Sequence, residues 1–131
     1  MQEPDAHVDG LAREVLGAAI EVHRNLGPGY LENIYEEAMA IELRLRGVTF
    51  ERQKPISLRY KGYPLGDHRL DLLVGAALVV ELKAVSLLAP IHHAQVLSYL
   101  KATSLTLGLL INFNVPLLKQ GIKRIILTSS L

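Results

Sequence analysis

The sequence contains no cysteine, so it can form neither disulfides nor thiolate metal sites, and nothing supports a secreted, oxidising context. It also lacks an excess of charge, because 14 Lys and Arg stand against 13 Asp and Glu. The electrostatic field of the whole protein therefore cannot attract a polyanion. Any nucleic-acid site must be a local patch.

We expect neither a membrane-spanning run nor a signal peptide in this sequence. The longest stretch without a charge, 102–118, contains Asn112, Asn114 and Pro116, so it suits a buried strand better than a membrane span. The first five residues are acidic and polar, unlike a signal peptide. We therefore expect a cytoplasmic protein without a membrane partner.

The length and composition suit one compact domain. With 131 residues, the chain can bury a core of its own but leaves no room for a second ordinary domain, so a single domain is expected over 1–131. Half of the residues are hydrophobic and 21% are charged, which excludes a disordered chain. So much apolar surface in a short chain also predicts a homodimer.

The periodicity of apolar residues predicts helices and strands in a definite order. Asp9 is a candidate cap for the first helix, and the pairs Lys61-Gly62 and Gly75-Ala76 are candidate turns. The expected elements are helices at 11–26 and 31–45, strands at 50–60, 65–74 and 78–85, a helix at 91–100, and strands at 105–113 and 122–127. This order fits an α/β sandwich with a mixed sheet.

Three charged residues stand in two neighbouring predicted strands, of which 78–85 is otherwise apolar. Glu81 and Lys83 stand two residues apart, so both side chains lie on one face of their strand. Asp71 lies in the preceding strand, and the turn at Gly75-Ala76 can bring it close to Glu81. Neighbouring carboxylates repel each other unless they share a proton or a cation, and a site with only oxygen ligands favours a hard divalent ion. The pattern predicts a magnesium-type site.

An acid in one strand followed by Glu-x-Lys in the next resembles the signature of PD-(D/E)xK nucleases, with Leu70 in place of the proline. Residues Gln95 to Tyr99 are similar to the Gln-x-x-x-Tyr element of RecB-like nucleases. Residues Gly29 to Tyr35 reproduce the Gly-x-x-Glu-x-x-Tyr pattern of the GxxExxY family. The resemblance spans about Leu11 to Leu127 and implies a restriction-endonuclease-like sandwich, with helices flanking a central mixed β-sheet.

The resemblance implies hydrolysis of DNA that depends on Mg²⁺, with Mn²⁺ as a second candidate. Asp71 and Glu81 would bind the cation with help from the main-chain carbonyl of Leu82. Lys83 would orient the attacking water, help to deprotonate it, or stabilise the developing charge. The runner-up is a module that binds nucleic acid or protein without turnover, which the near-neutral charge favours.

Two further residues are catalytic candidates with strong alternatives. Glu32 would hold a second metal ion or its water, but an acid in the first turn of a helix also stabilises the helix dipole. Gln95 would position the nucleophile. Tyr35 and Tyr99 are expected as core residues with a hydrogen-bonded hydroxyl.

Some charged residues also have a purely structural interpretation. Glu81 and Lys83 could form an ion pair on a solvated sheet face. Asp71 would then have no reason to be a metal ligand, because its interpretation depends on these two partners. His92 and His93 are adjacent on a predicted helix and point in different directions, so they cannot easily chelate one ion. We interpret them as surface or supporting groups.

Overall fold

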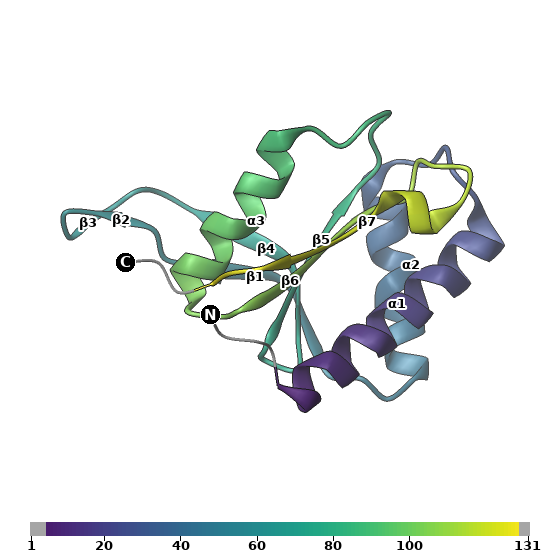
Figure 1. Ribbon diagram of the computed structural model, residues 1–131, viewed down its shortest axis with the longest axis horizontal. Coiled ribbons are helices and arrows are strands. Elements are labelled where there is room, and N and C mark those ends of the chain that lie inside the picture. Colours follow the sequence, from purple (N-terminus) through teal and green to yellow (C-terminus); the bar gives the residue numbers. More distant parts are fainter. Residues whose placement is uncertain (1–4, 129–131) are drawn as a thin grey trace.

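The computed structural model describes residues 5–128, which form a five-stranded sheet with helices on both faces (Figure 1). The strands are, in sheet order, β1 (Phe50–Ile56), β4 (His68–Val74), β5 (Leu78–Lys83), β6 (Leu107–Asn112) and β7 (Ile122–Ile126). Neighbours are antiparallel except β5 and β6, which are parallel and joined through helix α3 (Pro90–Thr103). This architecture confirms the predicted α/β class. The polar residues 1–4 lie outside the described residues.

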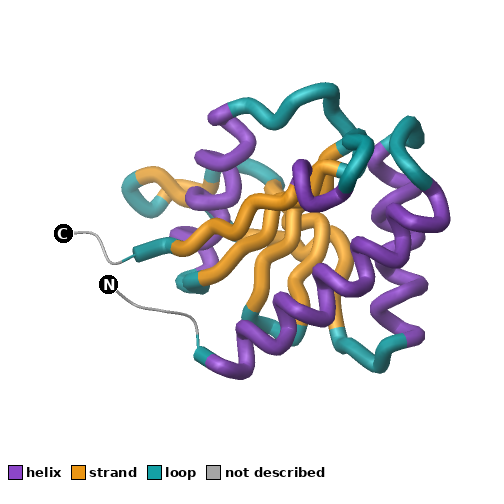
Figure 2. The backbone as a smooth tube through the Cα atoms, turned by 45° about the vertical axis from the view of Figure 1, so that its right-hand side comes forward, coloured by secondary structure: helices purple, strands orange, loops and turns teal. Residues whose placement is uncertain are grey.

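The helices divide between the two faces of the sheet. Helices α1 (Ala6–Leu26) and α2 (Glu32–Leu45) pack on one face, and α3 packs on the other (Figure 2). The three helices confirm the three that the periodicity predicts. Each buries apolar side chains against the strands.

The start of α1 differs from the sequence prediction. The carboxylate of Asp5 accepts a hydrogen bond from the main-chain N–H of Val8 at 2.9 Å and caps the helix. The prediction that Asp9 is the cap is therefore wrong. Asp9 lies in the first turn and pairs with Arg124 of β7 at 2.8 Å. The helix begins earlier than predicted because Val8 extends the buried apolar stripe by one turn ahead of Ala12.

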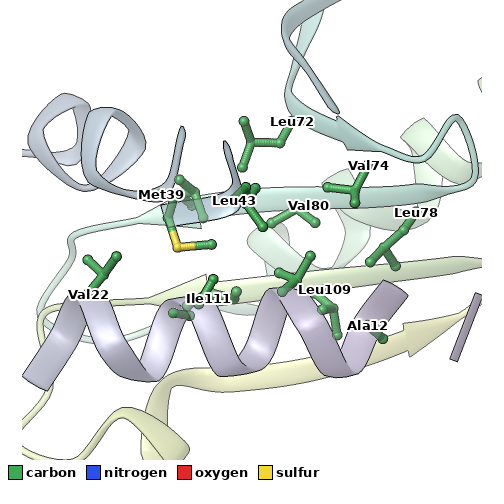
Figure 3. Close-up of a cluster of buried hydrophobic side chains, with 14 of the residues drawn as sticks. Ala12, Val22, Met39, Leu43, Leu72, Val74, Leu78, Val80, Leu109 and Ile111 are labelled. Atoms are coloured by element: carbon green, nitrogen blue, oxygen red, sulfur yellow. The ribbon is translucent and has the colours of Figure 1, made fainter. Parts of the chain in front are cut away.

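The sheet separates two hydrophobic clusters. The larger lies between the sheet and helices α1 and α2, where Leu78, Val80 and Leu82 of β5 contact it (Figure 3). The smaller lies beneath α3 and includes Val79 of the same strand. Since side chains alternate along a strand, Glu81 and Lys83 continue the face of Val79. The charged pair thus belongs to the face that α3 covers.

The strand expected at 50–60 is shorter than predicted. It ends at Ile56, and a small separate hairpin follows, made of β2 (Arg59–Tyr60) and β3 (Tyr63–Pro64). Figure 1 shows this hairpin projecting away from the sheet. Its turn is formed by Lys61 and Gly62, as predicted, with φ values of 50° and 85°. The alternation of apolar residues continues into the hairpin and hides this change of direction.

The apolar run predicted as a covered strand is β6, and all six of its residues are buried. Gly108 allows close packing there, because an added Cβ would lie 2.7 Å from the side chain of Val96 in α3.

Among residues 5–128, no helix combines the length and the hydrophobicity needed to cross a bilayer.

Candidate functional site

The pairing of β1 with β4 is interrupted at Gln53 and Asp71. These residues face each other outside the ladder, although pairing continues on both sides in the same register. Gln53 has a φ of 49°, in the left-handed region that residues other than glycine rarely adopt. As a result, Leu70 and Leu72 pack on opposite faces of the sheet although they are two residues apart. The interruption turns the polar groups of Asp71 toward β5.

Strands β4 and β5 diverge at Asp71. There the carboxylates of Asp71 and Glu81, in place of main-chain carbonyls, accept the main-chain hydrogen bonds between the two strands. Strand pairing ends at Leu72 and Val80. Beyond it, the N–H of Asp71 donates to Glu81 Oε2 at 2.7 Å, and the N–H of Leu82 donates to Asp71 Oδ2 at 2.8 Å. We call this point of divergence, with Asp71, Glu81 and the main chain of Leu82, the fork. The Leu82 carbonyl faces the fork, since the N–H and C=O of one strand residue point to the same edge. The structure thus brings Asp71 and Glu81 into direct contact.

Burial makes it costly to charge both acids. Glu81 is only 3% exposed, and its pKa rises from 4.5 to about 8, mainly because burial desolvates the carboxylate and further because Asp71 repels it. Burial also raises the pKa of Asp71, although the hydrogen bond from Leu82 acts in the opposite direction. Without a cation, burial and the charge of Asp71 therefore both favour the protonated form of Glu81.

Lys83 brings a positive charge to the fork. Its charge attracts both carboxylates and partly offsets the rise in the pKa of Asp71 and of Glu81. Its amine donates to Gln95 Oε1 over 3.4 Å, and Gln95 Nε2 donates to the hydroxyl of Tyr99 at 3.1 Å. Burial raises the pKa of Tyr99, and the charges of Glu81 and Asp71 raise it further. The Gln-x-x-x-Tyr spacing on α3 thus gives a hydrogen-bonded row that ends at the lysine.

Glu32 lies at the rim of the same group. It is an exposed residue in the first turn of α2, where an acid stabilises the helix dipole. Partial burial of its carboxylate raises its pKa, Asp71 raises it further, and Lys83 lowers it. The two interpretations of Glu32 are therefore compatible, because this carboxylate both lies at a helix start and faces the fork.

The Gly-x-x-Glu-x-x-Tyr motif ties the start of α2 to the end of β5. The hydroxyl of Tyr35 donates to the Gly27 carbonyl at 2.6 Å, and its ring stacks on Phe113 with centroids 4.5 Å apart. The N–H of Phe113 in turn donates to the carbonyl of Lys83 at 2.9 Å. Tyr35 is a core residue with a bonded hydroxyl, as predicted, and it fixes the helix turn that carries Glu32.

Sequence reasoning missed a second acid on α2. Glu36 accepts hydrogen bonds from Arg52 at 3.0 Å and from Gln53 Nε2 at 2.7 Å, and Gln53 Nε2 also lies 3.4 Å from Asp71 Oδ1. The charge of Glu36 raises the pKa of Asp71. Its four-residue spacing from Glu32 on a helix was the available signal.

Asn112 was also missed as a positioning residue. It is 1% exposed, its Nδ2 donates to the Val85 carbonyl at 2.9 Å, and its Oδ1 accepts from the Val85 N–H at 3.0 Å. The amide thus holds the chain two residues after Lys83. An isolated amide at the end of an apolar run could have indicated this role, because buried polar groups need partners.

The two histidines of α3 take no part in the fork. His92 Nδ1 accepts from the Ala89 N–H at 2.9 Å and helps to satisfy the helix start, and His93 is exposed. Both match the interpretation as surface or supporting groups.

The donor set at the fork fits a hard divalent cation. Asp71 and Glu81 offer only oxygen, and Mg²⁺ is commonly bound by one or two carboxylates, with water and substrate phosphate as the other ligands. The raised pKa of Glu81 supports this fit, because a cation would replace the proton that burial otherwise imposes. Within residues 5–128, no three or more His, Asp or Glu side chains are arranged to hold a metal, so Glu32 does not complete a three-ligand set.

The sequence matches the model of one known protein family. Residues 9–125 match the sequence model of a family described as the PD-(D/E)XK nuclease superfamily. The matched range includes both strands of the fork and the helices α2 and α3 that border it. No curated protein and no solved structure matches the chain.

Proposed function

The chain belongs to the PD-(D/E)XK nuclease superfamily, and on that premise we propose that it hydrolyses phosphodiester bonds of DNA with Mg²⁺ or Mn²⁺ at the fork. One observation carries the proposal. The buried carboxylate of Glu81 accepts from the main-chain N–H of Asp71, and its charge is coupled to the half-buried carboxylate of Asp71 and to Lys83. Such an arrangement costs stability without a cation, and perturbed groups of this kind cluster at functional sites.

Each residue of the fork has a distinct part in the proposed reaction. Asp71, Glu81 and the Leu82 carbonyl supply oxygen ligands, and the divalent ion, when bound, lowers the pKa of water and offsets charge on the phosphate. We assign Lys83 the part of stabilising negative charge that develops on a phosphate oxygen, which its charge beside Asp71 and Glu81 supports. Gln95 acts as a positioning residue, because its amide contacts the lysine amine and is itself held by Tyr99.

The outer acids shape the field of the fork. Glu32 is coupled to Asp71 and to Lys83 by charge, which suits a role in holding a water or a second ion. Glu36 is neutralised by Arg52 and orients Gln53 toward Asp71. We assign the first a role near the substrate and the second a structural one.

A panel of DNA substrates tests the proposed function. Wild-type protein with Mg²⁺ or Mn²⁺ is expected to cleave at least one of duplex, single-stranded and branched DNA, and EDTA is expected to stop cleavage. Lys83→Ala should lower the rate by about 100-fold, the usual cost of losing one group that stabilises developing charge. Lys123→Ala, which removes an exposed lysine from β7, is the matched control and should cleave as wild type does.

The panel also separates the proposal from its rival. If no substrate is cleaved with either metal, while DNA still binds, the protein is a binding module on a nuclease fold. Equal cleavage by wild type and Lys83→Ala would contradict the role of the lysine and point to a contaminating nuclease.

The homodimer remains a prediction, with exposed apolar side chains on the helices as its support. Leu45 is 77% exposed, Ile41 is 54% exposed, and Ile20 of α1 is 54% exposed. Light scattering at micromolar concentration should give twice the 14.5 kDa of one chain. A monomer mass under these conditions would refute it.

Three finer assignments remain predictions as well. The GxxExxY motif, with Glu32 facing the fork and Tyr35 anchoring the helix start, supports membership of that family. A single domain over 1–131 and a cytoplasmic location rest on composition alone.

A further inference from the structure

The hairpin of β2 and β3 exposes two tyrosines that contribute nothing to the core. Nine consecutive residues, from Arg59 to Asp67, are exposed. Tyr60 is 61% and Tyr63 is 73% exposed, and the two are direct partners across the hairpin, so their side chains share one face. Figure 1 shows the hairpin projecting beyond the sheet. A pair of aromatic rings held in solvent calls for a partner.

The hairpin and the residues that flank it carry a local excess of positive charge. Residues 52–69 contain five basic residues and a single acid, which gives +4 in a chain whose net charge is +1. The rest of the chain is therefore net negative. The basic residues are Arg52, Lys54, Arg59, Lys61 and Arg69. Arg52 pairs with Glu36 and Glu37, and Lys54 pairs with Glu51, so the excess rests on the other three. A nearly neutral protein thus has a local basic patch, which is the condition that a polyanion needs.

The turn of the hairpin gives a second sign of function. Lys61 has a φ of 50°, a conformation that favours Asn, Asp or Gly at this position of a tight hairpin. A lysine in this conformation strains the backbone. Its amine lies 5.4 Å from the centre of the Tyr60 ring, so the charge and the aromatic face form one surface.

We propose that this hairpin binds unpaired nucleotides of a nucleic-acid strand, with Tyr60 and Tyr63 stacking on bases and Arg59 and Lys61 contacting phosphates. Base stacking on aromatic rings combined with basic groups that follow the backbone is how single strands are bound without sequence readout. The proposal deepens the proposed function by naming single-stranded substrate, and rests on it for the identity of the ligand.

The strand that leaves the hairpin leads directly to the candidate active site. Tyr63 precedes Asp71 by eight residues, which limits their separation to roughly 30 Å. Asp71 itself lies in β4, whose first residue His68 follows the hairpin. A nucleic-acid strand whose bases stack on the tyrosines can therefore extend to the fork.

Fluorescence anisotropy in EDTA measures this binding without cleavage. The probes are labelled oligothymidylate and a blunt duplex of the same length, and wild type should bind the single strand more tightly. The Tyr60→Ala, Tyr63→Ala double variant should weaken oligothymidylate binding by about tenfold for each tyrosine lost. The matched double variant to Phe keeps both ring faces and should bind within about twofold of wild type.

Lys61→Asn tests the phosphate contact while preserving the turn. Asn-Gly is a favoured pair for this turn, so the hairpin should be no less stable than in wild type. The dependence of log Kd on log salt should become shallower by about 0.7, the value for one phosphate contact on a single strand. Melting curves of all variants should match wild type, because the altered side chains are exposed.

The outcomes distinguish this inference from the proposed function. If Ala and Phe double variants bind oligothymidylate equally well, or if wild type binds neither probe, the inference is overturned, whatever the cleavage panel shows. If the Ala variant loses binding but wild type cleaves no DNA with either metal, the hairpin inference stands and the nuclease proposal fails. If the Ala variant binds as wild type but changes from dimer to monomer, the tyrosines serve a second copy of the chain and the inference is overturned.

Discussion

The Asp71→Asn variant is expected to lose metal-dependent DNA cleavage by about 100-fold or more, because a metal ligand supplies several kcal/mol of charge stabilisation and about 1.4 kcal/mol corresponds to tenfold in rate. Asn keeps an amide oxygen that can accept from the Leu82 N–H, as Asp71 Oδ2 does at 2.8 Å. The fold of the fork should therefore survive, and the loss should concern chemistry rather than folding.

Initial rates on the substrate that wild type cleaves best, at saturating Mg²⁺, measure this effect. Asp9→Asn is the matched control, since it makes the same chemical change in an acid that pairs with Arg124 at the start of α1. It should cleave as wild type does. An Asp71→Asn protein with wild-type activity would remove Asp71 from the metal site and sink the proposed mechanism.

Stability without metal is expected to fall as the pH rises from about 5 to about 9. Glu81 has a pKa of about 8 in the folded protein and 4.5 as its ordinary value. Between these values the folded state binds more protons than the unfolded state, so the free energy of unfolding decreases with pH. The contribution is fully present below pH 4.5 and is lost as the pH passes 8. Since one pKa unit corresponds to about 1.4 kcal/mol, the change amounts to a few kcal/mol.

A divalent cation is expected to reverse this loss. Mg²⁺ or Mn²⁺ binds the charged carboxylates of the folded state only, so it should raise the melting temperature more at pH 8 than at pH 5. A metal concentration of about 100 times Kd stabilises by about 2.7 kcal/mol. Asp71→Asn should remove most of this response, and in EDTA at pH 8 it should be no less stable than wild type, because one of two repelling charges is gone.

Thermal melts at several pH values, in EDTA and in millimolar Mg²⁺, check both expectations. Glu81→Gln should flatten the pH profile, because Gln cannot titrate yet can still accept from the Asp71 N–H that Glu81 Oε2 now accepts at 2.7 Å. Glu14→Gln, an exposed acid paired with Arg46, is the control and should keep the wild-type slope. A structural ion pair predicts the reverse pattern, with little metal response and a destabilised Asp71→Asn protein.

Much of the site was predictable because its signals are local. Charged residues at positions 81 and 83 of an apolar strand must share a face, since the side-chain period of a strand is two. Gln95 and Tyr99 must share a helical face because they are four residues apart. The short connection at Gly75 and Ala76 made contact between neighbouring strands the simplest outcome. Local periodicity and short loops therefore predicted which residues meet.

Other parts depend on contacts between distant segments. The switch of faces between Leu70 and Leu72 follows from Gln53 in another strand, and no pattern within β4 reveals it. The bond from Gln53 to Glu36 and the clamp of Asn112 on Val85 likewise join residues far apart in sequence. The end of β1 at Ile56 was missed because alternation of apolar residues persists in the exposed hairpin.

The sequence by itself determined the three helices, the positions of the main strands, the two faces of β5 and the acid-acid-lysine set, since these follow from propensities and periods within a few residues. Only the tertiary structure decided that β4 and β5 separate at Asp71, that Glu81 is buried with a raised pKa, and that the segment with Tyr60 and Tyr63 projects as a separate hairpin. Desolvation and charge depend on what packs around a group, and that packing is complete only when distant strands and helices meet.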